Sequence, residues 1–249
     1  MTAVIEWSRL TWPEAETAVR EMPACLVPFG AIEEHGPHMP LQADNLLAEE
    51  VCRRVCERTG VILMPTVPYG QVWSAYRFPG TLSMSVDTLI AFTIDLVRSL
   101  RDHGFKLVLL HSGHVGNLVG LREAIRRCDA EMPDVKVVLL DRLAAALAEV
   151  EDVLTTRRSH PYYLHACEIE TSMVLEVAPE QVHMERAVCE YPDYPYDFDA
   201  TPTRWDLVTK SGVLGDATAA TPEKGKAIVD ALVAQLVAIT EREVHERCS

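Results

Sequence analysis

Carboxylate and imidazole side chains gather in one short segment near the N-terminal end of this 249-residue chain. The segment, residues 28–45, reads PFGAIEEHGPHMPLQADN and follows an apolar run with the length of a strand. Glu33 and His35 are two residues apart, so in an extended backbone their side chains point the same way and that of Glu34 points the other way. Asp44 adds a further carboxylate. Mixed oxygen and imidazole ligands suit divalent cations, so the spacing favours Glu33 and His35 as a ligand pair.

A second segment places histidines straight after another apolar run. Residues 107–117 read LVLLHSGHVGN, and the two glycines allow a close approach of the backbone. His111 ends the run and is expected to be a satisfied core histidine, whereas His114 in the glycine-rich turn is the better candidate ligand. Open α/β sheets place their sites at the carboxyl ends of their strands. The two segments therefore predict one shared site.

A third segment, residues 164–172, reads LHACEIETS and lies near the start of a predicted helix. His165 and Glu168 are three residues apart, so on a helix they would share one face. A purely structural role for these acids stays open as an alternative, because acids in a first helical turn are stabilised by the helix dipole. It stays open for the first segment too, as a polar surface loop in which Asp44 and Asn45 cap the next helix.

The elements that must position these residues alternate between short apolar runs and longer segments of helical period. This alternation predicts a three-layer α/β/α sandwich with a mostly parallel sheet and right-handed crossovers. No repeat, low-complexity tract or break in composition appears, so residues 1–249 are predicted to form one domain. The expected strands are residues 25–29, 61–65, 106–111 and 135–141, and the expected helices are 45–58, 86–103, 118–130, 169–175 and 222–245.

Residues 186–205 fit neither period, and their aromatics and prolines are too dense for a disordered linker. We expect a long ordered loop that borders the site.

Composition excludes several classes of protein. Lys and Arg number 23 and Asp and Glu 37, so the formal net charge is −14, which disfavours binding to nucleic acid or to anionic membranes. With no long apolar stretch and no signal-peptide pattern, we expect a cytoplasmic protein. The seven cysteines show no paired framework and are expected to be reduced thiols. Cys52 and Cys56 are four apart, but without a second pair they are better interpreted as buried small residues than as a metal clip.

Five ordered motifs resemble the creatininase (creatinine amidohydrolase) family, and together they extend over nearly the whole chain. They are Glu33-Glu34-His35-Gly36-Pro37-His38 with Asp44, Phe78-Pro79-Gly80-Thr81-Leu82-Ser83, Ser112-Gly113-His114-Val115-Gly116-Asn117, His165-Ala166 with Glu170-Thr171-Ser172, and Thr209-Lys210-Ser211-Gly212-Val213-Leu214-Gly215-Asp216.

The resemblance implies a creatininase-like α/β/α fold, assembly into homo-hexamers, and hydrolysis of C–N bonds of small amides at a site with one or two metals. By motif, Glu33, His35, Asp44 and His114 fall on metal-ligand positions, with Asp44 where a ligand bridges two metals. His165 falls on a position that faces the substrate, and we assign it as the general acid that protonates the leaving amine.

The chain departs from creatininases after the histidine of the glycine-rich turn. Creatininases carry a tyrosine and then a metal-binding glutamate there, whereas this chain has Val115 and Gly116. The expected substitute is a carboxylate from the helix after His165. Glu170 is favoured because it lies in the Glu-Thr-Ser signature, and Glu168 remains the alternative.

The expected substrate is not creatinine, because Pro161-Tyr162-Tyr163-Leu164 stands where the tryptophan and aspartate of the creatinine pocket should fall. Family members with similar turns include deformylases of pyrimidine intermediates, the peptidase of mycofactocin maturation and hydrolases of cyclic keto-inositols. Substrate contacts are predicted for Trp73, Ser74, Tyr76 and Val115, with packing in an aromatic core as an equal alternative for Trp73 and Tyr76.

These observations predict an amidohydrolase that uses one or two divalent cations (Zn²⁺, Mn²⁺ or Fe²⁺) to activate water against an amide, cyclic amide or formamide bond of a small molecule. The absence of cysteine from the ligand set argues against a closed structural zinc site. Two alternatives remain: a metal-dependent hydrolase of a cyclic keto-inositol or related ketone, and a non-catalytic metal-binding protein.

Overall fold

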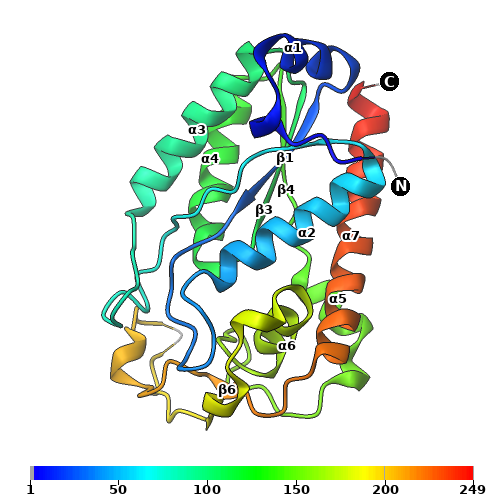
Figure 1. The fold of residues 1–249 in the computed structure, drawn as a ribbon. Coiled ribbons are helices and arrows are strands. Elements are labelled where there is room, and N and C mark those ends of the chain that lie inside the picture. Colours follow the sequence, from blue (N-terminus) through cyan, green and yellow to red (C-terminus); the bar gives the residue numbers. More distant parts are fainter. Residues whose placement is uncertain (1–2, 199, 249) are drawn as a thin grey trace.

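A parallel sheet of four strands forms the centre of the computed structural model, which describes residues 3–198 and 200–248 (Figure 1). The strand order is β2-β1-β3-β4, and each neighbouring pair is parallel. Register pairs Phe29 with Ser112, so β1 and β3 end side by side. The strands are β1 (Ala24–Phe29), β2 (Ile62–Leu63), β3 (Leu107–Ser112) and β4 (Lys136–Leu139).

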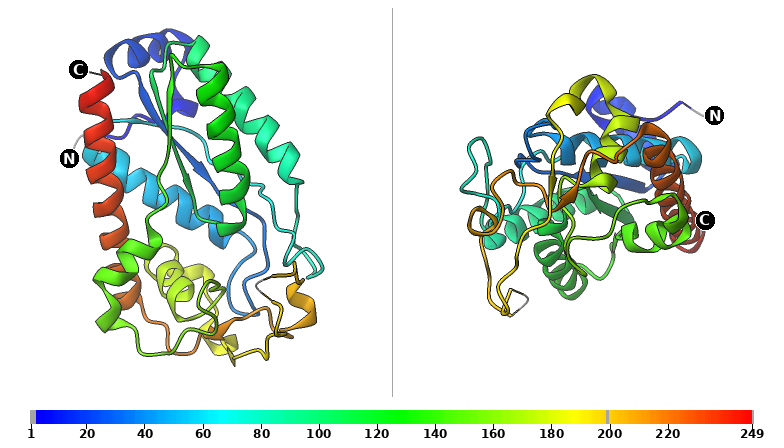
Figure 2. Two further views of the ribbon diagram at one scale, coloured as in Figure 1. Left: turned by 180° about the vertical axis from the view of Figure 1, so that it is seen from behind. Right: turned by 90° about the horizontal axis from the view of Figure 1, so that it is seen from below.

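Helices cover both faces of this sheet (Figure 2). One face packs against α2 (Ala43–Thr59) and α7 (Pro222–Cys248), and the other against α3 (Val86–Asp102) and α4 (Leu118–Glu131). Alternation along β1 and β3 divides the core, because neighbouring residues of a strand face opposite sides of the sheet. The predicted three-layer α/β/α sandwich is confirmed.

Two helices were not predicted. α1 (Trp12–Glu21) begins at a capping box in which Thr11 and Glu14 satisfy each other's backbone, a signal present in the sequence. α5 (Leu143–Glu149) is seven residues long and carries too short a period to detect. The predicted strand over residues 61–65 contains only the two residues of β2.

The remaining elements are short. α6 (Glu168–Val177) packs on α7, and within residues 186–205 the mostly irregular chain forms β5 (Cys189–Glu190), which pairs antiparallel with β6 (Gly215–Asp216). Residue 199 of that loop lies outside the described residues. The 3-10 helices are Trp7–Arg9, Val115–Asn117, Glu151–Val153, Pro179–Gln181, Met184–Arg186 and Trp205–Leu207.

All seven cysteines are free thiols. Cys52 and Cys56 are buried in the core between α2 and the sheet, and burial raises the pKa of Cys56 to about 12. The expectation of buried small residues is therefore confirmed. None of the described helices is long and apolar enough to cross a membrane.

The contact between α6 and α7 depends on a glycine. A Cβ added at Gly225 would lie 1.8 Å from the carbonyl oxygen of Ser172, so the two helices approach more closely than any side chain allows. α6 carries one of the predicted ligands, and this contact fixes its position.

We expect Gly225→Ala to lower the free energy of unfolding by about 1–3 kcal/mol through overpacking, although alanine is the better helix former. Urea denaturation measures the change. Ala234→Ser, which adds one atom on the exposed side of α7, is the control and should leave stability unaltered. A Gly225→Ala protein as stable as the wild type would contradict the packing argument.

Candidate metal centre

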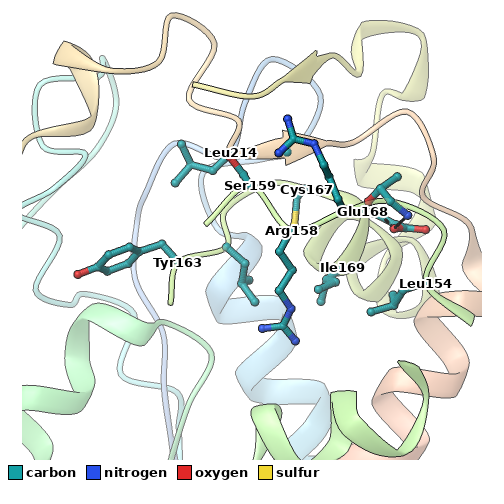
Figure 3. Close-up of a pocket in the computed structure, with 12 residues that line it drawn as sticks. Leu154, Arg158, Ser159, Tyr163, Cys167, Glu168, Ile169 and Leu214 are labelled. Atoms are coloured by element: carbon teal, nitrogen blue, oxygen red, sulfur yellow. Dashed lines mark hydrogen bonds between the residues drawn. The ribbon is translucent and has the colours of Figure 1, made fainter. Parts of the chain in front are cut away.

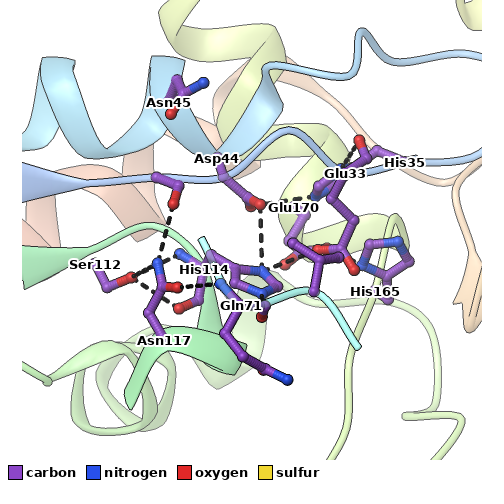
Figure 4. Close-up of polar contacts among 12 residues, drawn as sticks. Glu33, His35, Asp44, Asn45, Gln71, Ser112, His114, Asn117, His165 and Glu170 are labelled. Carbon is purple, nitrogen blue, oxygen red and sulfur yellow. Dashed lines mark hydrogen bonds and ion pairs between the residues drawn. The ribbon is translucent and has the colours of Figure 1, made fainter. Parts of the chain in front are cut away.

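Five predicted ligands converge where β1 and β3 end (Figure 4). Glu33 and His35 follow β1, and His114 follows β3. Asp44 lies in the first turn of α2 and Glu170 in the first turn of α6. None of the five is more than 8% exposed. Such burial is rare for carboxylates unless they are paired or bind a metal.

The Asp44 carboxylate lies between two imidazoles. Its Oδ1 is 3.3 Å from His35 Nε2, and its Oδ2 is 3.3 Å from His114 Nδ1. Glu33 Oε2 lies 2.9 Å from the same His114 nitrogen. Asp44 therefore presents one oxygen to each half of the cluster and could serve as a ligand to a cation in either half.

Backbone carbonyls orient the two imidazoles. His114 Nε2 donates to the carbonyl of Gln71 at 2.8 Å, and His35 Nδ1 donates to the carbonyl of Glu33 at 3.2 Å. A carbonyl only accepts, so each of these ring nitrogens carries a proton and the opposite nitrogen faces the carboxylates. The same arrangement of an outer acceptor and an inward nitrogen holds metal-binding histidines in proteins.

Three buried atoms of the cluster have no hydrogen-bond partner among the described residues: Glu33 Oε1, His35 Nε2 and Asp44 Oδ2. Each such group costs about 1–3 kcal/mol if it stays unsatisfied. Ligand atoms of Glu33, Asp44 and His114 lie within 4.8 Å of one another, as do those of Glu33, His35 and His165. The donor set and its unsatisfied atoms fit a divalent cation.

The pKa shifts of the buried histidines and carboxylates also fit a cation site. Burial alone lowers a histidine pKa, but the Asp44 carboxylate raises the pKa of His35 to about 10, and Glu33 with Asp44 raises that of His114 well above its usual value. Burial opposes ionisation of Asp44, yet the two imidazoles hold its pKa far below normal. Behind them, burial and the charge of His35 lower the pKa of His38 to about 4, so this imidazole is neutral. The cluster thus favours additional positive charge.

Glu168 points away from this cluster. Its carboxylate accepts hydrogen bonds from the backbone and hydroxyl groups of Thr155 and Thr156 and pairs with Lys224. Burial opposes ionisation, but Lys224 and the threonines lower the Glu168 pKa to about 2. The prediction that His165 and Glu168 share a helical face is wrong, because α6 begins at Glu168 and His165 precedes it.

Glu170 faces the cluster instead. Its Oε2 accepts from the backbone N–H of Ala166 at 2.6 Å and lies 3.9 Å from His165 Nδ1. Burial raises the pKa of Glu170. Ala166 has φ of +49°, a left-handed conformation that is uncommon for a residue with a Cβ and occurs here beside the site.

The space around Gly116, which stands where the family resemblance predicts a glutamate, explains why this position is a glycine. A Cβ at Gly116 would lie 2.3 Å from His114 Nε2 and 2.5 Å from the Gln71 carbonyl oxygen. A side chain there would break the hydrogen bond that orients His114.

His165 is oriented by Glu34, a residue that the sequence did not single out. His165 Nε2 lies 2.8 Å from the carbonyl oxygen of Glu34 and 3.1 Å from its Oε1. The other carboxylate oxygen of Glu34 accepts from the Gly36 N–H at 2.9 Å. His165 Nδ1 is the ring nitrogen that makes no hydrogen bond to Glu34; its nearest carboxylate is that of Glu170, at 3.9 Å.

The cluster opens into a pocket with a volume of about 650 Å³. Glu33, His114, His165 and Glu170 form its floor, together with three predicted substrate contacts, Trp73, Ser74 and Val115. Tyr76, the fourth, is not brought to this pocket: its side chain is partly exposed and its hydroxyl accepts from Arg77 Nε at 2.9 Å.

Aromatic residues that the sequence analysis did not name as substrate contacts complete the wall: Tyr162, Tyr163, Phe198 and Trp205. The Trp205 ring lies 4.6 Å from that of His165. Two of the four belong to the loop expected to border the site. The high density of aromatic residues in that loop was the sequence signal that could have identified Phe198 and Trp205 as pocket residues.

Two further expectations have clear outcomes, and one residue was missed. His111 is a satisfied core histidine, because its Nδ1 donates to the Leu140 carbonyl at 2.8 Å. Asp44 and Asn45 do not cap α2, since Gln42 occupies the N-cap position. Asn117 was missed as a positioning residue. Its amide contacts the Gly30 carbonyl, the Ser112 hydroxyl and the Gln71 N–H.

Fold and site together define an α/β protein with a candidate metal centre at the carboxyl ends of its strands. A family model described as creatinine amidohydrolase matches residues 8–240. The chain belongs to the creatininase family.

Individual relatives agree with this assignment. A creatinine amidohydrolase from Pseudomonas putida is 33% identical over 244 residues, 90% of this chain and 91% of the relative. A mycofactocin precursor peptide peptidase from Mycobacterium ulcerans is 30% identical over 85% of this chain and 82% of its own. A solved structure described as "Creatininase Mn" superposes with a TM-score of 0.81 at 29% identity, covering 99% of this chain and 100% of that one.

The contact between Glu34 and His165 can be tested through a distant glycine. A Cβ at Gly212 would lie 1.9 Å from Glu34 Oε2, and Gly212 has φ of +83°. We expect Gly212→Ala to displace the Glu34 carboxylate and to abolish the NMR signal of the hydrogen-bonded His165 Nε2 proton.

Gly60→Ala is the matched control, because Gly60 has φ of +75° but open space around it. Both variants should lose about 1–2 kcal/mol of stability from the left-handed backbone, and Gly212→Ala should lose more. Identical behaviour of the two variants in thermal unfolding and in the imidazole NMR spectrum would contradict the prediction. That result would show that the absence of a side chain at Gly212 is not needed to hold the Glu34 carboxylate against His165.

Proposed function

We propose that this protein is a metal-dependent amidohydrolase that cleaves a C–N bond of a small amide, cyclic amide or formamide other than creatinine. One observation carries the proposal: the unsatisfied atoms Glu33 Oε1, His35 Nε2 and Asp44 Oδ2 lie together, beside a pocket of about 650 Å³. A closed structural metal site has no such pocket beside it.

Glu33, Asp44 and His114 would hold one cation, and His35, Asp44 and Glu170 a second. Mixed oxygen and nitrogen ligands suit Zn²⁺, Mn²⁺ or Fe²⁺, and the similarity to a structure described as Creatininase Mn supports Mn²⁺ among them. When bound, such cations lower the pKa of water and polarise a carbonyl oxygen.

Chain residues supply the proton and the orientation. His165 lines the pocket with its Nε2–H held by the Glu34 carbonyl, so its Nδ1 could first take up a proton from the attacking water and then give it to the leaving amine. Trp205 packs against the ring and limits its rotation. Homo-hexameric assembly stays a prediction.

We expect Glu33→Gln to reduce amide turnover at least ~100-fold while thermal stability and oligomeric state are retained, because the substitution removes a ligand oxygen without changing size. The assay profiles amides, formamides and cyclic ketones with wild-type and variant protein. Glu49→Gln, an exposed substitution on α2, is the control. Undiminished turnover in Glu33→Gln would refute the proposal, and turnover of ketones alone would favour the ketone hydrolase.

Metal content separates the two candidate carboxylates of α6. Wild-type protein loaded with Zn²⁺, Mn²⁺ or Fe²⁺ should hold about two cations per subunit, and Glu170→Gln about one, by elemental analysis. Glu168→Gln should keep the wild-type content but unfold at lower temperature, because it breaks a buried pair with Lys224. Metal loss in Glu168→Gln alone would reverse the ligand assignment. No bound metal under any condition would overturn the proposed function.

A further inference from the structure

One cation on the pocket wall, Arg158, has no hydrogen-bond or ion-pair partner among residues 3–198 and 200–248. Asp141, which also lines the pocket, is neutralised by Arg122 at 2.6 Å, and Glu33 and Glu170 belong to the metal cluster. Arg158 lines both this pocket and a smaller neighbouring cavity (Figure 3). Its guanidinium makes no hydrogen bond or ion pair within the part of the chain that the structure describes.

The backbone on either side of Arg158 is fixed. Before it, the carbonyl of Arg157 accepts from the Tyr191 hydroxyl at 3.1 Å, and the Arg157 guanidinium lies 4.0 Å from the Tyr191 ring. After it, the Ser159 and Tyr194 hydroxyls share a hydrogen bond of 2.8 Å. Arg157 and Ser159 are thus held to the loop of residues 186–205. Of these three consecutive residues, only Arg158 lines the large pocket.

The next residue extends this support. His160 is buried among the rings of Tyr163, Tyr194 and Phe198, with centroids 4.9, 5.0 and 5.3 Å from its own. Tyr163 and Phe198 present their other sides to the pocket wall. The segment that carries Arg158 therefore also shapes the aromatic part of the pocket.

We propose that Arg158 binds an anionic group of the substrate, a carboxylate or a phosphate, while the apolar or aromatic body of the substrate packs on the rings of the pocket. A guanidinium binds either oxyanion through paired hydrogen bonds. The chain is strongly acidic overall, so an unpaired cation at this place selects for anions that the rest of the surface repels. This inference rests on the proposed function, which places the scissile amide at the cluster.

The test uses matched probes with the metal-loaded protein: N-benzoylglycine, its uncharged counterpart N-benzoylglycinamide, and N-benzoylaminomethylphosphonate. Calorimetry should show the wild type binding one of the anionic probes at least ~10-fold more tightly than the uncharged one. The anion with the higher affinity identifies carboxylate or phosphate as the natural group. Arg158→Gln should abolish the preference without altering affinity for the uncharged probe, and Arg158→Lys should restore part of it.

Arg157→Gln is the control, because Arg157 stacks on Tyr191 and does not line the large pocket. It should keep the wild-type preference. A preference that persists in Arg158→Gln would mean that the anion binds the cations directly, and it would overturn the proposal, as would equal binding of charged and uncharged probes by the wild type.

Hydrolysis of a broader amide panel separates this inference from the one on which it rests. If Arg158 sets the binding preference but no amide is hydrolysed, the anion site stands and the proposed function fails. If neutral amides are hydrolysed and Arg158→Gln changes neither KM nor kcat for charged ones, the function stands and the anion site fails.

Discussion

Carboxylates buried close together are the constraint that shapes this protein. Glu33, Asp44 and Glu170 lie within one small region from which water is almost excluded, and like charges so placed repel one another strongly. The imidazoles of the cluster compensate part of this negative charge. Asp44 and Glu170 each lie in a first helical turn, so the positive ends of the α2 and α6 helix dipoles compensate a further part. The proposed divalent cations would neutralise the remaining negative charge and would use the buried ligand atoms that form no hydrogen bond among the described residues.

The fold positions the cluster by placing the carboxyl ends of β1 and β3 side by side. β1 and β3 are parallel neighbours, and the Asn117 side chain joins the turns that follow them through the Gly30 carbonyl and the Ser112 hydroxyl. Its amide oxygen also accepts from the N–H of Gln71, whose carbonyl orients His114. One amide therefore couples the sheet edge to the imidazole, so a disturbance of the turn reaches a ligand through two hydrogen bonds.

Sequence reasoning succeeded where the relation between residues is local. The spacing of Glu33 and His35 and their place after a strand depend on a few neighbouring residues, and the periodic segments gave the layers of the fold. The family resemblance favoured Glu170 over Glu168, but spacing alone gave no reason for that choice, because both residues lie in one helical turn. Their difference comes from Thr155, Thr156 and Lys224, which reach Glu168 from distant segments. The contact of Trp205 with His165 could not be predicted for the same reason, since these two residues meet only in the folded chain.

Chemistry and selectivity are carried by different parts of the molecule. The candidate ligands lie at the ends of regular elements, where the sheet and helices fix them, whereas much of the pocket wall comes from two mostly irregular segments, residues 158–163 and residues 198 and 200–205. These segments contact each other, as His160 does Phe198, and the first is also held by Tyr194 and, through the residue before it, by Tyr191. Apart from Trp205, which packs on His165, their side chains can therefore change with little effect on the buried charges. It follows that the substrate has to be inferred from the wall and the type of reaction from the cluster, because neither fixes the other.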